Sequence, residues 1–207
     1  MTGASQGIGR ALALECARRG ARVSVCARSD EALTAVAAEV AGVGGVIDIC
    51  DEHAVTTWLH AATSQSGPID VLVNNAGMLG PKATLAEYPL DAWRDVFEVN
   101  AVGTFVVTQA ALPHMTRPGG IMAHVSSYLG RFALPRYGAY CASKFAVEGL
   151  ARLVAEEHRD EGLISVAIDP GMVGTEMLKA AQESDDVSGA PTPAEAAIAF
   201  ADLLERL

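Results

Sequence analysis

Ser126-Ser127-Tyr128-Leu129-Gly130 through Tyr140-Cys141-Ala142-Ser143-Lys144 is the stretch around which the chain is organised. It follows the apolar run 121–125, which predicts a buried strand that would hold the Ser127 hydroxyl rigidly at its end. Its second part predicts a helix, and residues four apart on a helix lie on one face, about one turn apart. The sequence therefore places the side chains of Tyr140 and Lys144 next to each other.

The pair of Tyr140 and Lys144 indicates acid–base chemistry. An ammonium beside a phenol favours the phenolate, so we expect Lys144 to lower the pKa of Tyr140 from its ordinary value of about 10. Such a tyrosine can exchange a proton with a substrate oxygen near neutral pH. A tyrosine four residues before a lysine is also common on exposed helices, and serine pairs are common at strand ends. A surface helix without chemistry is therefore the alternative.

A glycine-rich loop, Thr2-Gly3-Ala4-Ser5-Gln6-Gly7-Ile8-Gly9, stands near the start of the sequence, and apolar residues at helical spacing follow it. Glycines let a backbone approach a pyrophosphate closely, and the helix behind the loop would point its free N–H groups and positive dipole end at that group. Glycines also make ordinary turns, so the loop alone is weak support for a dinucleotide site.

Strands and helices alternate along the whole chain. Apolar runs predict strands at 21–27, 45–49, 69–73, 121–125 and 163–168. Helical patterns predict helices at 30–40, 51–65, 90–115, 137–159 and from Pro193 onward, with Asp30 capping the first of these. Strands that are apolar nearly throughout and alternate with helices predict a parallel sheet covered on both faces. With no linker or repeat, we expect a single domain over residues 1–207.

Composition limits the classes of partner. The formal net charge of −10 disfavours binding to nucleic-acid backbones or anionic membranes. No apolar run approaches the roughly 18 residues of a membrane span, and no charged-then-apolar leader is present, so we expect a cytoplasmic protein. The 4 cysteines lack metal-ligand spacing, which predicts reduced thiols and no metal.

Five motifs, in the expected order, resemble the short-chain dehydrogenase/reductase family. The loop 2–9 resembles the family's cofactor loop, and Asn74-Asn75-Ala76-Gly77 resembles its sheet-stabilising motif. Asn100, Ser127, Tyr140 and Lys144 match its catalytic tetrad, and Pro170-Gly171 with Thr175 resembles the segment that holds the nicotinamide carboxamide. The resemblance covers residues 1 to about 178, and it implies a Rossmann-like, doubly wound parallel sheet in three layers.

The resemblance also implies a role for each tetrad residue. Tyr140 would be the acid or base that exchanges a proton with a carbonyl or alcohol oxygen, and Ser127 would hydrogen-bond the same oxygen. Lys144 would lower the pKa of Tyr140 and hold the nicotinamide ribose. Asn100 would interrupt its helix, so that a backbone carbonyl can hold a water for proton relay to Lys144. The expected activity is hydride transfer between NAD(P) and a small ketone or secondary alcohol.

The cofactor is expected to be NADP(H), with NAD(H) as the alternative. An NAD enzyme usually carries an acidic residue at the end of the second family strand, whereas this sequence has Ala27 and Arg28 there. Gln6 stands where some NADP enzymes have a basic residue, which weakens this preference. The expected cofactor contacts are Gly3, Ser5, Gln6, Gly7, Ile8, Gly9, Arg28, Ser29, Asp48, Ile49, Asn75, Ala76, Gly77, Tyr140, Lys144, Pro170, Gly171, Val173 and Thr175.

Two departures from the family pattern affect the expected fold. Family members have an apolar strand before the Thr-Gly pair and another after the last helix, and this sequence shows neither, so we expect the sheet to lack its first and last strands. An unfilled slot in the sheet would leave two rows of backbone groups unpaired, each costing roughly 1–3 kcal/mol if buried. Asp169 also stands where the family usually has Asn.

The substrate is expected to be a free small molecule. Apolar residues follow the site motifs, which predicts an apolar pocket; they are Met78, Leu79, Leu129, Phe132, Met172 and Met177. One alternative is a β-ketoacyl carrier-protein reductase, but the stretch that would face its acidic carrier has Glu176, Glu183, Asp185 and Asp186 against Lys179. Another alternative is a catalytically idle dinucleotide-binding protein. By resemblance, we expect a homodimer through the helices at 90–115 and 137–159.

Overall fold

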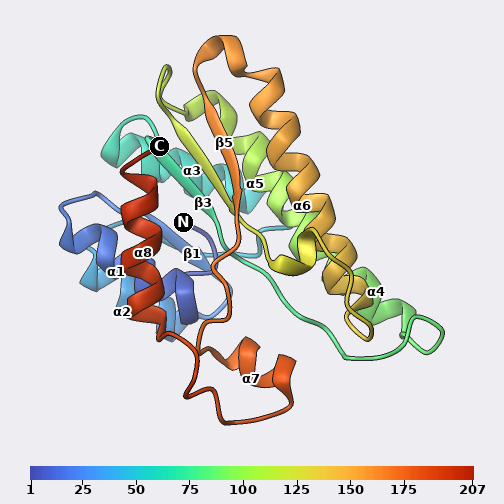
Figure 1. Cartoon of the computed structure of the whole chain (residues 1–207). Coiled ribbons are helices and arrows are strands. Elements are labelled where there is room, and N and C mark those ends of the chain that lie inside the picture. The colour runs from blue at the N-terminus through green and yellow to red at the C-terminus, as the bar shows by residue number, and fades with distance from the viewer.

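The computed structural model of the chain describes residues 1–207 and shows parallel strands between two layers of helices (Figure 1). Strands β3 (Val71–Asn74), β4 (Ile121–Val125) and β5 (Ile164–Ile168) form one parallel sheet, with β4 in the middle. Strands β1 (Val25–Ala27) and β2 (Gly44–Val46) form a second parallel sheet. The predicted α/β class and parallel pairing are confirmed, but the sheet is divided into two.

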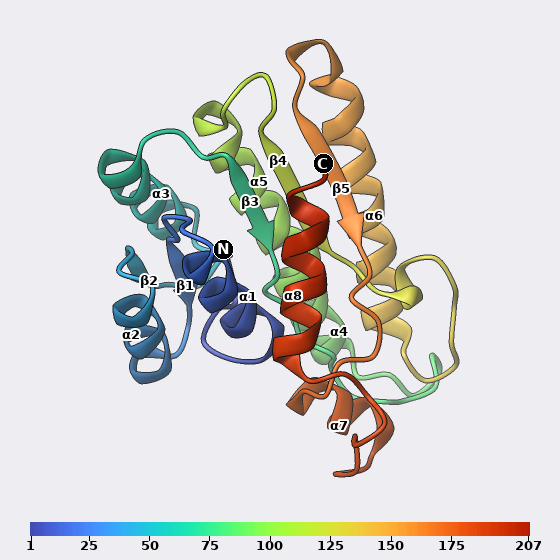
Figure 2. The same ribbon diagram turned by 60° about the vertical axis from the view of Figure 1, so that its left-hand side comes forward.

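Helices cover both faces of the strands. Helices α3 (Glu52–Ser66), α5 (Thr104–Ala111) and α6 (Gly138–Glu157) lie on one face, and α1 (Gly7–Arg18) and α8 (Pro193–Leu204) lie on the other (Figure 2). Helix α2 (Asp30–Glu39) packs on β1 and β2. The residue that caps α2 is Ser29, without a side-chain hydrogen bond, so the prediction that Asp30 caps this helix is wrong.

The alternation of side chains along the strands builds a core on each face. Leu72 and Met122 belong to a cluster with residues of α3 and α5, while Val73 and Ala123 belong to a cluster with Phe200 and other residues of α8. All five residues of β4 are buried, as expected of a central parallel strand.

The segment predicted as one helix at 90–115 is interrupted at its centre. It consists of α4 (Leu90–Phe97), a π-helical turn (Glu98–Gly103), α5 and a 3₁₀ turn (Leu112–His114). Asn100 lies in the π-helical turn, which confirms that it interrupts the helix. Leu90–His114 is also long and apolar enough to cross a membrane by length and composition alone, so the expectation that no segment approaches a span is wrong. The segment packs against α3 and α6, as a core helix does.

A cavity of about 630 Å³ separates the two sheets. We call it the slot. Its walls include Val23 and Ser24 before β1, Val71 and Val73 of β3, Trp58 and Leu59 of α3, and residues of α1 and α8. The expected gap in the sheet is therefore present, between β1 and β3.

Met1 and Thr2 bridge one end of the slot. The amino group of Met1 donates to the Ser24 carbonyl at 2.7 Å, and the Met1 carbonyl accepts from the N–H of Cys26 at 3.0 Å. The N–H of Thr2 donates to the Val73 carbonyl at 3.0 Å. These two residues thus pair with both sheets in the direction of a parallel strand.

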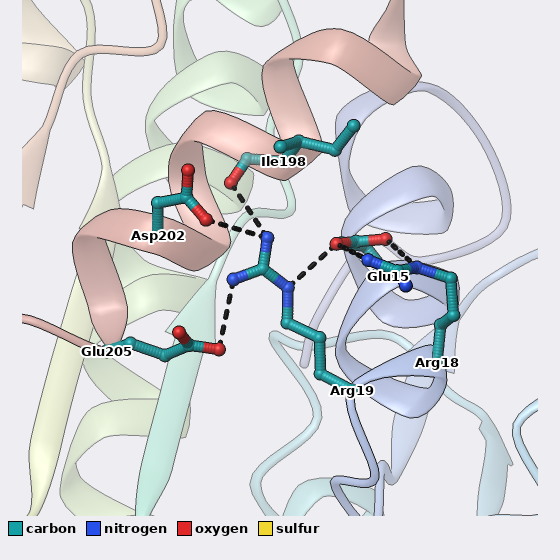
Figure 3. A network of polar contacts seen from close by, with 6 residues as sticks. All are labelled: Glu15, Arg18, Arg19, Ile198, Asp202 and Glu205. Atoms are coloured by element: carbon teal, nitrogen blue, oxygen red, sulfur yellow. Dashed lines mark hydrogen bonds and ion pairs between the residues drawn. The ribbon is translucent and has the colours of Figure 1, made fainter.

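An arginine at the end of α1 fastens α8 to it (Figure 3). Arg19 forms ion pairs with Glu15 at 2.7 Å, Asp202 at 2.8 Å and Glu205 at 3.0 Å. Its guanidinium also donates to the carbonyl of Ile198, at 3.4 Å. Because three carboxylates from two helices share one cation, α1 and α8 are held together along one wall of the slot.

Candidate active site

The predicted site residues gather at the carboxyl ends of the parallel strands, where ligands of open α/β sheets bind. Ser127 follows β4, Asn75 follows β3 and Pro170 follows β5. Figure 2 shows the strand arrows pointing toward the end of the molecule that holds α7 (Glu176–Gln182).

Tyr140 and Lys144 lie one turn apart on α6, as predicted, and both are buried. The Lys144 ammonium lies 5.6 Å from the centroid of the Tyr140 ring and donates a hydrogen bond to the Val125 carbonyl at 2.7 Å. Ser127 hydrogen-bonds Tyr140, and its hydroxyl oxygen also accepts from the N–H of Leu129 at 3.2 Å. Serine, tyrosine and lysine therefore form one cluster between β4 and α6.

Burial dominates the acid–base properties of this cluster. It raises the pKa of Tyr140, and the hydrogen bond with Ser127 offsets part of that rise. Burial also lowers the pKa of Lys144 to about 8. The prediction that the pKa of Tyr140 lies below its ordinary value is therefore wrong for this structure, because desolvation of the phenolate by burial is the largest influence on it.

Asn100 joins the cluster from the π-helical turn. Its amide accepts from the N–H of Met78 and donates to the Met78 carbonyl, both at 2.8 Å, and also donates to the Ser143 hydroxyl at 2.9 Å. A side chain on Gly77 would meet Asn100 Oδ1 at 3.2 Å and Lys144 Nζ at 3.6 Å. The structure therefore brings all four tetrad residues together.

The glycine-rich loop packs against the segment that follows β3. The Asn75 side chain donates to the carbonyls of Thr2 and Gly3 at 3.0 and 3.1 Å. A Cβ on Gly3 would lie 2.7 Å from Ala76 Cα, and one on Gly9 would lie 2.4 Å from Asn75 Nδ2. Glycine is thus required at both positions because the segment after β3 packs so closely against the loop, whether or not a ligand is bound.

Helix α1 begins beside this loop without a side-chain cap. Its N-cap residue, Gln6, makes no capping hydrogen bond, and the first turn holds no acidic residue. The N–H groups of the first turn are therefore available to an anionic group such as a pyrophosphate. Ser5 and Ile8 lie within the same segment.

The remaining predicted cofactor residues occupy the ends of the two-stranded sheet and of β5. Arg28 and Ser29 follow β1 and are exposed, as is Asp48 after β2. The side chain of Ile49 is buried in the core, which leaves only its backbone to face a ligand. Gly171 has a φ of +73°, and its N–H donates to the Asp169 carboxylate at 2.9 Å. The charge of Asp169 acts on Tyr140 and contributes to the rise in its pKa.

Helix α7 spans the site and was not predicted, since the sequence shows only a polar, acidic stretch there. Thr175 caps its N-terminus by accepting from the N–H of Leu178, and its methyl lies 3.4 Å from the Cβ position of Gly7. At the other end, Lys82 and the hydroxyl of Tyr137 donate to the Ala181 carbonyl, at 2.8 and 2.6 Å. The helix therefore extends from the cofactor loop to the start of α6.

Much of the apolar surface near the site is open. Met172 is 66 % exposed and Phe132 is 54 % exposed, while Met78, Leu79 and Leu129 are half-buried and Met177 is exposed. Tyr128 stacks on Phe132 with ring centroids 4.6 Å apart, a contact that the sequence did not indicate. This surface fits an apolar substrate better than a strongly charged one.

A parallel α/β sheet with a glycine loop before a helix, and with a buried tyrosine–lysine pair at the same edge, defines a dinucleotide-dependent oxidoreductase. The profile of the short chain dehydrogenase family matches residues 1–186. An NADPH-dependent pterin aldehyde reductase of Arabidopsis thaliana is 38 % identical over 183 residues, which span 86 % of this chain and 75 % of that protein.

Solved structures agree with this similarity. A short-chain dehydrogenase from Escherichia coli CFT073, complexed with NADPH, superposes with a TM-score of 0.91 at 32 % identity, covering 98 % of this chain and 88 % of the other. A short-chain dehydrogenase from Shigella flexneri 2a, complexed with NADP, superposes with a TM-score of 0.86 at 32 % identity, covering 93 % and 84 %. The chain therefore belongs to the short-chain dehydrogenase family of NAD(P)-dependent oxidoreductases.

Proposed function

We propose that the protein is an NADP(H)-dependent carbonyl reductase or alcohol dehydrogenase for small, apolar substrates, with Tyr140 as its acid and base. The observation that carries this proposal is the cluster of Ser127, Tyr140, Lys144 and Asn100 beside an uncapped helix N-terminus. A catalytically idle nucleotide-binding protein has no chemical need for a buried lysine, whose ammonium is desolvated at a cost.

In the reduction direction, Ser127 donates a hydrogen bond to the substrate carbonyl oxygen and Tyr140 transfers its proton to that oxygen. The nicotinamide cofactor, when bound, supplies the hydride that the carbonyl carbon receives. A raised pKa keeps Tyr140 protonated before the reaction, which suits a proton donor. Lys144 stabilises the phenolate that remains, and Asn100 keeps the Lys144 turn of α6 against Gly77.

NADP(H) is favoured over NAD(H) by the charges at the end of β1. Arg28 is exposed there, and no carboxylate precedes it in the strand, so a 2′-phosphate would meet a cation. Two of the related structures contain NADPH or NADP, and the Arabidopsis relative is NADPH-dependent, which supports the same choice. The residues that would hold the dinucleotide are those of the loop 2–9, Arg28, Asn75 to Gly77, and Pro170 to Thr175.

Replacing Arg28 tests the cofactor preference. In Arg28→Ala we expect NADPH affinity to fall by about one to two decades, since a charge-assisted hydrogen bond is lost, while NADH affinity stays within a few-fold. Arg22→Ala is the matched control, because Arg22 is also exposed but precedes β1. Fluorescence titration with both cofactors measures these affinities. An unchanged ratio of NADPH to NADH affinity in Arg28→Ala would show that Arg28 does not determine the cofactor preference.

We propose a free substrate and not a carrier-bound acyl chain. The two arginines between Ser127 and Tyr140 in the sequence are already paired, Arg131 with Glu148 at 3.0 Å and Arg136 with Glu183 at 3.3 Å. Asp185 and Asp186 lie beyond α7 and are exposed. An acidic carrier protein would therefore meet like charges at this rim, which slows encounter and disfavours docking.

A substrate panel tests the function directly. NADPH oxidation is followed with small aldehydes, cyclic and linear ketones, and a β-ketoacyl group offered on carrier protein and as a short thioester at low salt. We expect turnover with free apolar carbonyls. Absence of turnover with every carbonyl, despite NADPH binding, would favour the idle nucleotide-binding protein, and strong preference for the carrier-bound form would favour a β-ketoacyl reductase.

We further propose a cytoplasmic homodimer formed through the segments 90–115 and 137–159, without nucleic acid or membrane as a partner. Support comes from apolar side chains exposed on these helices. Phe105 is 47 %, Phe145 46 % and Leu153 53 % exposed, and the last two lie on one stripe of α6. Sedimentation that gives a monomer at micromolar concentration would contradict the dimer.

A further inference from the structure

A continuous chain of hydrogen bonds crosses the core from β5 to α6. We call it the polar chain. It consists of seven side chains, each at least nine-tenths buried, namely Ser165, His124, Asn74, Thr108, Thr104, Asn100 and Ser143. Sequence analysis identified only Asn100 among them by its chemistry. The signal it missed is a threonine at each of the two four-residue steps after Asn100, which places all three on one face of a helix.

The first part of the polar chain connects the three strands with α5. His124 lies between Ser165, at 3.3 Å from Nε2, and the Asn74 amide nitrogen, at 3.2 Å from Nδ1. The same nitrogen donates to the Thr108 hydroxyl at 3.0 Å. An amide nitrogen only donates, so Nδ1 of His124 accepts and Nε2–H donates to Ser165. Burial, with the nearby charge of Lys144, lowers the pKa of His124 to about 4 and keeps it neutral.

The second part runs along the helix to the active site. The Thr108 hydroxyl donates to the Thr104 carbonyl at 2.7 Å, and the Thr104 hydroxyl donates to the Asn100 carbonyl, also at 2.7 Å. The Asn100 amide donates to Ser143, whose hydroxyl donates to the Tyr140 carbonyl at 2.8 Å. Since each hydroxyl has one proton and that proton is used, the direction of every bond in this part is fixed.

The polar chain holds Asn100 at the point where the π-helical turn widens the helix. The Asn100 side chain fixes the backbone of Met78, and the neighbouring Gly77 lies against both Asn100 and Lys144. Through Ser143, the same side chain holds the turn of α6 that carries Tyr140 and Lys144. An apolar core would fill this space without the cost of burying seven polar groups. Their presence therefore requires another explanation than packing.

We propose that Thr104, Thr108, Asn74 and His124 are positioning residues, which act through Asn100 to hold Lys144 and Tyr140 in their reactive geometry. This inference rests on the proposed function, because it assigns the four residues to the same proton transfer. The purely structural alternative is that the polar chain only satisfies buried groups. The two explanations differ in their prediction for a variant that loses one hydroxyl without a change of shape. A positioning role predicts a loss of kcat, and a purely structural role does not.

Valine has the shape of threonine without its hydroxyl, so Thr104→Val and Thr108→Val each remove one link of the polar chain. Thr104→Ser and Thr108→Ser restore the hydroxyl. Thr63→Val is the matched control, since Thr63 also bonds the carbonyl four residues earlier, at 2.9 Å, but lies on α3 outside the site. For the valine variants of the polar chain we expect kcat to fall roughly ten- to a hundredfold with little change in KM for NADPH.

A second readout does not depend on turnover. The phenol of Tyr140 is titrated by ultraviolet absorbance in the cofactor-free protein, as the difference between each variant and the same variant carrying Tyr140→Phe. We expect the midpoint to shift downward, toward the ordinary tyrosine value, in Thr104→Val and Thr108→Val, because burial raises the pKa of Tyr140 and a loosened turn of α6 lets water reach the phenol. The serine variants should return both kcat and the midpoint toward the parent values, and Thr63→Val should change neither.

Folded valine variants that keep the parent kcat and the parent midpoint would overturn the inference, as would serine variants that are as impaired as the valine ones. If Thr104→Val does not fold, the same measurements on Thr108→Val test the inference, because Thr108 is one link further from Asn100. Failure of the proposed function looks different. A parent protein without reductase activity would refute that function, while the tyrosine titration would still show whether the polar chain positions Lys144 and Tyr140.

Discussion

The two sheets differ in how they are held together. In the sheet of β3, β4 and β5, the central strand has a neighbour on each side and is buried throughout. In the sheet of β1 and β2, the strands have three residues each, and Val46 of β2 is 50 % exposed. We call the first the catalytic half, because it carries the tetrad, and the second the cofactor half, because Arg28 and Asp48 lie at its strand ends.

Few backbone and side-chain bonds join the halves at the strands. Met1 and Thr2 bridge one end of the slot, and Asn75 ties the loop 2–9 to the end of β3. The difference teaches that the geometry of the tetrad depends on contacts within the catalytic half alone. The position of the cofactor residues relative to the tetrad depends on the junction. Changes in the catalytic half should therefore affect the chemical step, and changes at the junction should affect cofactor affinity and stability.

A large effect is expected from Lys144→Met, which removes the ammonium from the catalytic half while keeping a long side chain. We expect kcat to fall by roughly 10²–10⁴-fold, as for loss of a proton-transfer group, and NADPH binding to weaken as well. Arg159→Met, in the 3₁₀ turn that follows α6, is the control for a lost exposed cation. Steady-state kinetics with a substrate from the panel measure the effect, and near-parent kcat in Lys144→Met would remove the lysine from the mechanism.

Filling the slot with a strand should join the two halves and raise the free energy of unfolding of the protein. A segment of five apolar, β-branched residues fused before Met1 can pair with both edges in the direction that Met1 and Thr2 already follow. Each buried backbone hydrogen bond contributes about 1 kcal/mol, so we expect the free energy of unfolding to rise by roughly 3–5 kcal/mol. A fused glycine–serine segment of the same length is the control. Equal denaturant midpoints for the two fusions would show that the slot does not accept a strand.

The buried ammonium of Lys144 also predicts a pH dependence of stability. Its pKa is about 8 in the folded protein, against an ordinary value of 10.5. Between these values the unfolded chain binds more protons than the folded protein, so the free energy of unfolding rises as pH increases from 8 to 10.5. We expect a rise of roughly 2–3 kcal/mol across that window.

The pH dependence should be absent from Lys144→Met, which has no titrating group at this position. Denaturant unfolding of both proteins at a series of pH values isolates the lysine from other groups that titrate in the same range. Parallel curves for the parent and the variant would mean that burial does not depress the lysine pKa.

A smaller effect is expected from Asn75→Ala, which cuts two hydrogen bonds at the junction. The free energy of unfolding should fall by roughly 1–3 kcal/mol, because the carbonyls of Thr2 and Gly3 lose a donor. NADPH binding should weaken, while the tyrosine titration of the catalytic half stays unchanged. Gln65→Ala, on the exposed side of α3, is the control. A shifted Tyr140 midpoint in Asn75→Ala would show that the halves are not independent.

The sequence predicted the parts of the fold that depend on local pattern. The run 121–125 is the strand β4 with the same bounds, and the helix at 137–159 differs from α6 by one or two residues at each end. The strand predicted at 21–27 is shorter, Val25–Ala27, because residues 22–24 face the slot and have no neighbouring strand on that side. Helix α7 was missed because it is short and buries none of its residues.

The part of the candidate site that depends on local pattern was also predicted. Motif residues such as Ser127, Tyr140 and Lys144 could be placed because each sits at a fixed offset from a strand or on one helix face. Apart from the spacing of Asn100, Thr104 and Thr108, the polar chain could not be predicted, because its other contacts join β3, β4, β5, α5 and α6, which are far apart in sequence. The pKa of Tyr140 was predicted in the wrong direction, since spacing along a helix gives the distance to a charge but not the depth of burial.

The most direct test of the central claim compares the parent with Tyr140→Phe, a substitution that removes only the ionisable hydroxyl. NADPH oxidation with a carbonyl substrate is measured at saturating cofactor, and NADPH affinity is measured for both proteins by fluorescence titration. The account predicts that turnover is abolished while the affinity for NADPH is largely unchanged. Turnover in Tyr140→Phe near the parent rate would contradict it.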